Sequence, residues 1–555
     1  MFPACSNHTT HFRLWAPFAQ QVGLQLLGPS AVQVYSMERV SDGYHTLTLD
    51  CGHGQLYQYV INGRTVPDPA SAFQPEGVHG PSMVVDFSQF KWSDQDWTGV
   101  ALADLIFYEI HIGTFTQAGT YSAAIRQLDE LVNLGVSAIA LMPLAQCPGR
   151  WNWGYDGVDV YAPNHMYGDP ASLATFVDAC HQRGLAVVLD VVYNHVGPEG
   201  NYLQLLGPYF GDRSTPWGHA FELSGSAQQP VRSFFLQNAV YWVEHYHFDG
   251  LRFDAVGAIH DEEAVHLINE IGCALRERAA VLGRHVHAIG EANLHRPEFL
   301  PAQGGTLDAI WVDDVAHALG SCLDLPAVCK SRCYAGLSDL VQALRLGYVF
   351  AVKQDEIFKL SPADCPPFLE AHVHYLQNHD LVGNRPQGKR IHQWTSPVVQ
   401  RALIPLVLLH PSIPLLFMGE EYAADSPFLF FTDFGQEELS LSVERGRADE
   451  FKHSGFAETV SPTCPKAFRL SKVSSLQDGD WTTYEWYKKL IKIRKFWRSE
   501  GFLYGEHLRV EHQDSVITLT YKMGKNLRYV ATDIFGHRPT VFDSVTASEM
   551  NCGFG

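Results

Sequence analysis

The 555-residue sequence lacks the features that mark membrane proteins and secreted, disulfide-rich proteins. Its longest apolar stretch, 402–418, is interrupted by three prolines and a histidine, so it cannot form a continuous membrane helix. The first ten residues contain neither a basic region nor an apolar run, so we expect no signal peptide. The eleven cysteines are scattered without a CxxC pair, which is typical of reduced thiols. We therefore expect a cytoplasmic protein.

Motifs for nucleotides, metals and nucleic acids are also missing. No GxGxxG or GxxxxGKS follows a predicted strand, and Cys329 and Cys333 have no matching Cys or His pair, so no metal or other cofactor is expected. The formal charge is −20 and no Lys/Arg cluster is present, which disfavours a nucleic acid or an anionic membrane as partner. A neutral polar substrate fits better, and we expect a monomer or a homodimer.

What is present indicates a globular protein of roughly three units, with 46% apolar and 18% charged residues. Short runs of alternating apolar residues between turn residues predict an N-terminal β-sandwich, immunoglobulin-like, over 1–95. Asn62-Gly63 is a strong hairpin signal. We assign 96–498 to a catalytic barrel and 499–555 to a small C-terminal β domain, in which three strands are visible.

The central part alternates strands with helices, which is typical of a parallel sheet. Eight such units in one run favour a closed (β/α)₈ TIM barrel over an open doubly wound sheet, which would be expected to carry a Gly-rich phosphate loop. The predicted strands are 105–112, 138–144, 186–195, 250–256, 287–292, 307–312, 371–376 and 415–418.

The strand 250–256 presents Arg252 and Asp254 on the same side, because side chains alternate along a strand. Two buried charges must pair or do chemistry, and on this strand alone a structural ion pair is as consistent as catalysis. Other predicted strands also end in polar residues, and the carboxyl ends of barrel strands are where active sites form. The ends in question carry Asp190, Asn194 and His195, then Glu291, and then His379 and Asp380.

Two carboxyl groups without a metal or nucleotide motif are what cleavage of an acetal requires. Asp254 beside Arg252 should stay ionised and act as the nucleophile. Glu291 has no cation adjacent in sequence, so we expect a raised pKa and a role as general acid and base. Asp380 could stabilise positive charge on the sugar ring, while His195 and His379 bind its hydroxyls.

Further polar and aromatic residues near these strand ends are predicted to contact or organise the substrate. Asp190 is expected to orient Asn194 or Arg252. In the loop 149–157, Tyr155 is the favoured sugar-stacking residue, with Trp153 a further candidate, although aromatic rings are as often core residues. Asp314 is an equally balanced case, since it could line the pocket or cap the next helix.

These residues resemble the α-amylase superfamily of glycoside hydrolases. The resemblance rests on Asp190-Val-Val-Tyr-Asn-His195, Gly250-Leu-Arg-Phe-Asp254, Glu291 and Asn378-His-Asp380, in the family's order. It implies a retaining mechanism with Asp254 as nucleophile, Glu291 as acid/base and Asp380 as the third essential carboxylate. Retaining enzymes separate the two reacting carboxyl groups by about 5 to 5.5 Å, which we predict for Asp254 and Glu291.

Within the superfamily, the chain is similar to members that cleave the α-1,4 bond next to the terminal trehalose of maltooligosyltrehalose. Motifs such as Trp311-Val-Asp-Asp314 and 414–422 carry this similarity, whereas 292–297 and 315–317 depart from it near the expected position of the leaving sugar. A branching or debranching α-glucanase therefore remains an alternative. A non-catalytic glucan-binding protein is a third possibility, disfavoured because all three carboxylates are retained.

Overall fold

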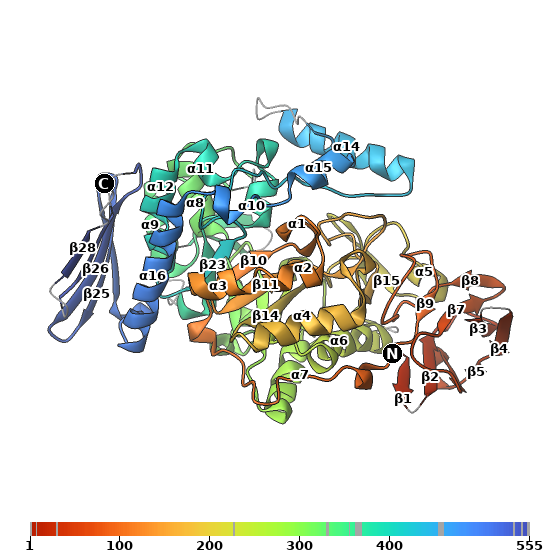
Figure 1. Cartoon of the computed structure of the whole chain (residues 1–555). Coiled ribbons are helices and arrows are strands. Elements are labelled where there is room, and N and C mark those ends of the chain that lie inside the picture. Colours follow the sequence, from red (N-terminus) through yellow and green to blue (C-terminus); the bar gives the residue numbers. More distant parts are fainter. Residues whose placement is uncertain are drawn as a thin grey trace.

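The computed structural model describes residues 3–551 apart from 7, 29–30, 226–227, 329–331, 354–355, 361–368, 453–459, 537–538 and 545–547. Its centre is a closed barrel of eight parallel strands, as predicted (Figure 1). Every residue in these strands is buried, as expected when helices cover the outside and side chains fill the inside. The strands are β10 (Phe107–Ile110), β11 (Ala138–Leu141), β14 (Ala186–Val191), β17 (Gly250–Phe253), β18 (His287–Glu291), β19 (Ala309–Trp311), β22 (His372–Tyr375) and β23 (Ile413–Phe417).

The barrel strands are mostly shorter than predicted, because the chain leaves the sheet where its polar residues begin. Thus β17 ends at Phe253, and Asp254 lies just beyond the strand. Alternate strand residues fill the barrel, where Phe107, Val188 and Ile289 belong to one apolar cluster. The site residues are therefore held at the rim of a packed core.

Helices surround the barrel. The predicted helix 122–134 is divided into α2 (Tyr121–Ile125) and α3 (Leu128–Leu134), and Gly135, with φ of 104°, ends α3 as expected. The predicted helix from Asp261 begins later, because Asp261 pairs with Arg232 and accepts a hydrogen bond from Leu267 N at 2.6 Å. The others that position the site or the barrel are α4 (Pro170–His181), α6 (Gln228–His245), α7 (Leu267–Leu282), α8 (Asp314–Cys322), α9 (Leu337–Leu346), α10 (His379–Gly383) and α16 (Trp481–Ser499).

The N-terminal strands form two antiparallel sheets that pack face to face, with the Phe12 and Tyr57 rings 5.0 Å apart. Asn62 and Gly63 both have positive φ, of 49° and 84°, which confirms the predicted tight turn. One sheet contains β1 (Ala4–Ser6), β2 (Thr9–Trp15), β5 (Glu38–Arg39) and β6 (Tyr44–Leu49). The other contains β3 (Val22–Leu27), β4 (Val32–Ser36), β7 (Leu56–Ile61), β8 (Arg64–Val66) and β9 (Ser82–Met83).

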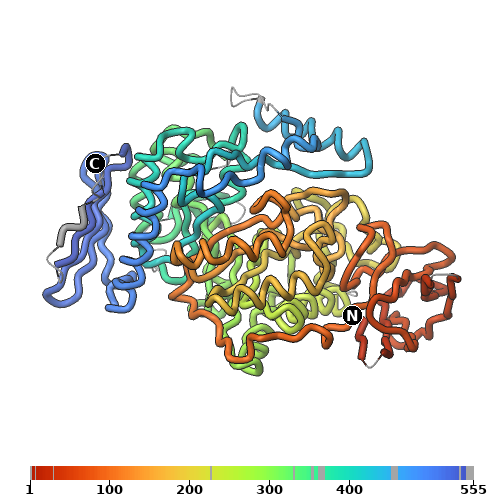
Figure 2. The backbone as a smooth tube through the Cα atoms, in the orientation of Figure 1, coloured from red at the N-terminus to blue at the C-terminus, as the bar shows by residue number. Residues whose placement is uncertain are grey.

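The C-terminal strands form one five-stranded antiparallel sheet at the opposite end of the molecule from the N-terminal sheets (Figure 2). The sheet packs on α16, where Trp497 and Tyr521 are 5.9 Å apart. Its strands are β24 (Leu508–Gln513), β25 (Val516–Met523), β26 (Asn526–Asp533), β27 (Thr540–Asp543) and β28 (Ser548–Asn551), the last two not predicted. Among the described residues, no helix is long and apolar enough to cross a membrane.

Candidate active site

Arg252 lies at the centre of the candidate site and is only 3% exposed. Its Nη1 is 2.7 Å from both Asp190 Oδ2 and Asp254 Oδ1, and its Nη2 is 3.9 Å from Glu291 Oε2. Three neighbouring strands, β14, β17 and β18, thus bring three carboxyl groups to one buried guanidinium. A structural ion pair needs one carboxylate, so two of the three are in excess.

The environment of Glu291 raises its pKa. Burial and the nearby charge of Asp254 raise the pKa of Glu291 to about 8, although Arg252 acts in the opposite direction. Its Oε2 accepts a hydrogen bond from Ala255 N at 2.8 Å. Ala255 has φ of 43°, which is uncommon for a residue other than glycine and often found at functional sites. A carboxyl group that is protonated at neutral pH can donate a proton.

Asp254 is held by hydrogen bonds to both of its carboxylate oxygens. Arg252 donates to Oδ1, and Asn194 Nδ2 donates to Oδ2 at 2.9 Å. Asp190 orients Arg252, not Asn194, and it also accepts a hydrogen bond from Tyr155 at 2.8 Å. Burial raises the pKa of Asp190 to about 7 despite Arg252. Charge-assisted contacts of this kind fix the direction in which Asp254 can react.

His379 joins the barrel rim to Tyr155. Its Nδ1 lies 2.6 Å from Glu109 Oε1, and its Nε2 lies 2.7 Å from the Tyr155 hydroxyl. Burial acts to lower the pKa of His379, but Glu109 and Asp380 outweigh it and raise the pKa to about 9. Asp380 itself is half exposed and lies 3.6 Å from His379 Nε2, so it is free to face a ligand. Glu109 was not among the predicted site residues.

His195 is held by Asn194 and by the backbone oxygen of Tyr155, and its ring stacks on Trp217 at 5.2 Å. Trp217 is 51% exposed at the turn of a hairpin formed by β15 (Phe210–Thr215) and β16 (Gly218–Phe221). Sequence reasoning missed it. The available signal was a tryptophan inside a Pro/Gly turn, where no core requires an aromatic ring.

Two predicted substrate contacts need correction. Asp314 is fully buried and is bound by Arg332 and by Val349 N at 2.6 Å, so it lies behind the cavity wall. Trp153 is 3% exposed, stacks on Phe428 at 5.2 Å and donates to Leu429 O, so its ring serves packing beneath His379. Both residues support the site and do not line it.

Asp313, adjacent to Asp314, takes the place that was predicted for its neighbour. Arg332 binds both of its oxygens, at 3.0 and 2.8 Å, and His317 Nε2 is 3.0 Å away. Burial acts to raise the pKa of Asp313, but His317 and Arg332 outweigh it and lower the pKa. A fixed negative charge therefore faces Glu291 across the site and contributes to its raised pKa.

Some of these groups, including Glu291 and Asp380, line a cavity of about 190 Å³ at the carboxyl end of the barrel, here called the catalytic cavity, whereas Asp254 pairs with Arg252 in its wall. Both donors and acceptors face it, as the recognition of a polyhydroxy compound requires. Within the described part of the chain, no three His, Cys, Asp or Glu side chains converge as metal ligands would, and Cys329 lies outside that part. Its lining includes Arg252, Glu291, Asn293, Trp311, Asp313, His317, Arg332, Tyr375, Asn378, Asp380 and Asn384.

A TIM barrel with this carboxyl cluster at its carboxyl end is the architecture of an α-amylase-type glycoside hydrolase. The family described as "Alpha amylase, catalytic domain" matches residues 88–208. The malto-oligosyltrehalose trehalohydrolase of Saccharolobus solfataricus is 36% identical over 98% of this chain and 97% of its own length. That of Deinococcus radiodurans is 38% identical over 94% and 89%. The chain belongs to the malto-oligosyltrehalose trehalohydrolase family.

Solved structures share the fold. A crystal structure titled putative alpha amylase from Salmonella typhimurium matches with a TM-score of 0.85 and 34% identity, covering 95% of this chain and 92% of its own. An Anoxybacillus pullulanase complexed with maltotetraose has a TM-score of 0.70 at 22% identity, covering 96% of this chain and 81% of its own, and shares the fold. Among the alternatives, the Bacillus subtilis branching enzyme GlgB is more distant, at 28% identity over 74% of this chain and 68% of its own.

Proposed function

We propose that this protein hydrolyses the α-1,4 bond next to the terminal trehalose of maltooligosyltrehalose, with retention of configuration. The observation that carries this proposal is the unequal environment of two carboxyl groups around Arg252. Asp254 is bound on both oxygens by donors, while Glu291 has a pKa of about 8. One carboxylate and one carboxylic acid, side by side at neutral pH, are the two reagents that a retaining glycosidase needs.

In the first step, Asp254 attacks the anomeric carbon while Glu291 gives its proton to the glycosidic oxygen. The bond to the trehalose unit breaks, trehalose leaves neutral, and the glucan remains as an ester on Asp254. In the second step, Glu291, now a carboxylate, takes a proton from water, and the hydroxide oxygen replaces Asp254 at the same carbon. Glu291 is protonated again and Asp254 is released as a carboxylate.

The other predicted residues are assigned to binding and orientation. Arg252 and Asn194 keep Asp254 aligned, which lowers the entropic cost of attack. Asp380 stands free to stabilise the positive charge that develops on the sugar ring. Both ring nitrogens of each histidine are already bound, those of His379 by Glu109 and Tyr155 and those of His195 by Asn194 and the Tyr155 backbone, so we assign both histidines to holding Tyr155 beside the substrate.

The leaving trehalose is assigned to the side of the catalytic cavity that Asn293, Asp313 and His317 line. This wall follows Glu291 and β19. We also propose that the protein acts in the cytoplasm, which is consistent with eight free thiols among the described cysteines. We propose that it is a monomer or a homodimer. The division into 1–95, 96–498 and 499–555 is proposed with it.

Product analysis tests the proposal. The protein is incubated with maltotriosyltrehalose, and the products are separated by chromatography. Free trehalose and maltotriose are expected, with the new reducing end of maltotriose released as the α anomer in an early NMR spectrum. Maltose or glucose as the sole product would refute trehalose release, and an initial β anomer would refute retention. A changed chain-length distribution of amylopectin would instead support a branching or debranching enzyme.

A further inference from the structure

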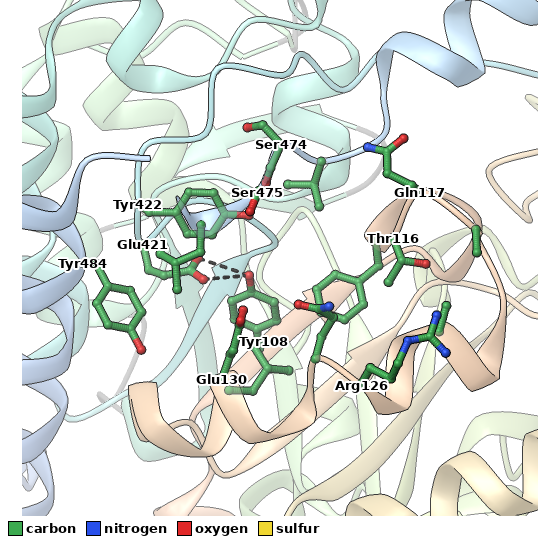
Figure 3. Close-up of a pocket in the computed structure, with 17 residues that line it drawn as sticks. Tyr108, Thr116, Gln117, Arg126, Glu130, Glu421, Tyr422, Ser474, Ser475 and Tyr484 are labelled. Atoms are coloured by element: carbon green, nitrogen blue, oxygen red, sulfur yellow. Dashed lines mark hydrogen bonds between the residues drawn. The ribbon is translucent and has the colours of Figure 1, made fainter. Parts of the chain in front are cut away.

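A second cavity, of about 400 Å³, lies on the side of the barrel, outside the catalytic cavity (Figure 3). We call it the side cavity. It is enclosed by residues of β10, by α2 and α3, by the chain that follows β23, by 473–476 and by the start of α16. Its volume is within the range of small-molecule sites. None of its lining residues belongs to the site described above.

The floor of the side cavity is polar and fixed. The Tyr108 hydroxyl donates to Glu421 at 2.9 Å and accepts from Gly419 N at 2.9 Å. The Tyr422 hydroxyl donates to Ser474 O at 2.8 Å. Burial raises the pKa of Glu421 to about 7, so this carboxyl can either accept or donate a hydrogen bond near neutral pH. Figure 3 shows the Glu421 and Tyr108 side chains directed toward each other.

The walls combine rings with uncharged and charged polar groups. Phe115, Tyr422 and Tyr484 supply aromatic surface, and the exposed side chain of Gln117 and the half-buried one of Gln127 stand at the rim. Aromatic faces beside amide and carboxyl groups are suited to sugars, whose C–H faces stack while their hydroxyls need both donors and acceptors.

The charged residues that line the side cavity narrow the choice of ligand. Glu130 and Glu421 disfavour an anion, and Arg126 disfavours an organic cation. A neutral polyhydroxy compound is repelled neither by the two glutamates nor by Arg126. We propose that the side cavity binds a neutral, disaccharide-sized carbohydrate, a second saccharide site separate from the catalytic cavity.

The side cavity and the active site are connected through strand β10, in which Tyr108 and Glu109 are consecutive residues. Tyr108 forms its floor, while the next residue, Glu109, binds both the backbone N and Nδ1 of His379, at 3.0 and 2.6 Å. A ligand that moved Tyr108 would therefore act on the residue that aligns His379. The proposal rests on the proposed function only for its choice of probes, trehalose as product and maltose as a glucan unit.

Calorimetric titration of the full chain tests this site. The Glu291→Gln variant, which should not turn substrate over, is titrated with trehalose and separately with maltose. Two binding events are expected for at least one sugar. Adding Gln127→Ala and Glu130→Ala, the first half-buried and the second exposed at the rim, should weaken one event by about tenfold or more and leave the other unchanged. Asp129→Ala, exposed on α3 but outside the lining, is the matched control and should change neither.

A single binding event for both sugars would overturn the proposal, as would two events that the rim variant leaves unchanged. Binding of choline, an organic cation, at the rim residues without binding of either sugar would also overturn it. Failure of the proposed function is separate, because that failure would appear in the wild-type products and not in the number of sugar sites. Changed binding in Asp129→Ala would count against the assignment to this cavity.

Discussion

Strand β17 has an aspartate just outside each end, and the two aspartates serve opposite purposes. Asp249 precedes the strand at the amino end of the barrel, and Asp254 follows it at the carboxyl end. Both are ionisable side chains beside positively charged groups in the protein. The difference lies in the balance of charge around each one.

At the amino end of the barrel, the carboxylates of Asp249 and Asp94 each have histidine partners. Asp249 lies 3.0 Å from His181 and accepts from Trp97 Nε1 at 2.7 Å, and Asp94 lies 2.8 Å from His181 and 2.7 Å from His247. Burial acts to raise the pKa of Asp94, but these histidines lower it, and the two aspartates raise the pKa of His181. Such a cluster holds the segment 92–97 to the barrel. It is a structural ion pair network.

At the carboxyl end, Asp190, Asp254 and Glu291 share the single guanidinium of Arg252. Burial, together with the charge of Asp254, leaves Asp190 and Glu291 with raised pKa values of about 7 and 8, although Arg252 acts in the opposite direction. Carboxylates that are each paired with a cation stabilise a fold. Carboxyl groups that outnumber their cation can bind and release protons near neutral pH. Perturbed pKa values of this type are a general mark of functional sites.

The largest expected effect is on turnover in Asp254→Asn. Loss of the nucleophile should lower kcat by about 10⁴-fold or more, since removal of a covalent nucleophile has effects of this order in other enzymes. Hydrolysis of maltotriosyltrehalose measures it, and circular dichroism checks that the variant is folded. Substantial remaining turnover in a folded variant would remove Asp254 from the nucleophile role.

Glu291→Gln should lower kcat by about 10²–10⁴-fold, the usual contribution of general acid–base catalysis. Glu291 donates a proton in the first step and accepts one in the second, so the loss applies to trehalose release and to hydrolysis of the ester. Single-turnover measurements separate the two steps. Normal rates in either step would mean that another group carries the proton there.

Asp249→Ala at the other end of β17 should leave kcat near the wild-type value and lower stability. Removing it leaves Trp97 Nε1 and His181 Nε2 without a partner, although Asp94 still binds His181 Nδ1, and breaking a buried pair in this way costs about 3–5 kcal/mol. Thermal unfolding measures the loss. If Asp249→Ala instead reduced turnover while unfolding like the wild type, the two ends of the strand would not differ as described.

Asp313→Asn should have the smallest effect, a shift in pH dependence with little loss at neutral pH. Removing a negative charge near Glu291 lowers the pKa of Glu291, while Arg332 keeps its ion pair with Asp314. The alkaline limb of kcat/KM should therefore move to lower pH. An unmoved limb would show that Asp313 does not act on Glu291.

Much of the barrel could be predicted because its signals are local. Apolar runs identified all eight strands, and the polar residues that end β14, β17, β18 and β22 pointed to one rim. The spacing of Arg252 and Asp254 was sufficient to place both charges together. The hairpin at Asn62-Gly63 was predictable for the same reason, since two adjacent residues determine its conformation.

The remainder depends on contacts between distant residues. Asp314 and Asp313 are neighbours in sequence, and only the position of Arg332 and Val349 decides which of them faces the cavity. From the sequence, Trp153 was equally consistent with sugar stacking and with packing, and Phe428, far along the chain, covers its ring. Trp217 reaches His195 because a hairpin folds back. The predicted separation of the Asp254 and Glu291 carboxyl groups stays a prediction.

The pH dependence of kcat/KM in the wild-type enzyme tests the central claim most directly, because it reports the pKa of the free enzyme's general acid. Glu291 must be protonated to act as the acid, so activity should persist through neutral pH and fall as pH rises through about 8. A fall in activity as pH rises between about 4 and 5, the ordinary range for the pKa of a glutamate, would contradict the account. It would mean that the carboxyl groups around Arg252 are as fully matched as those at the amino end of the barrel.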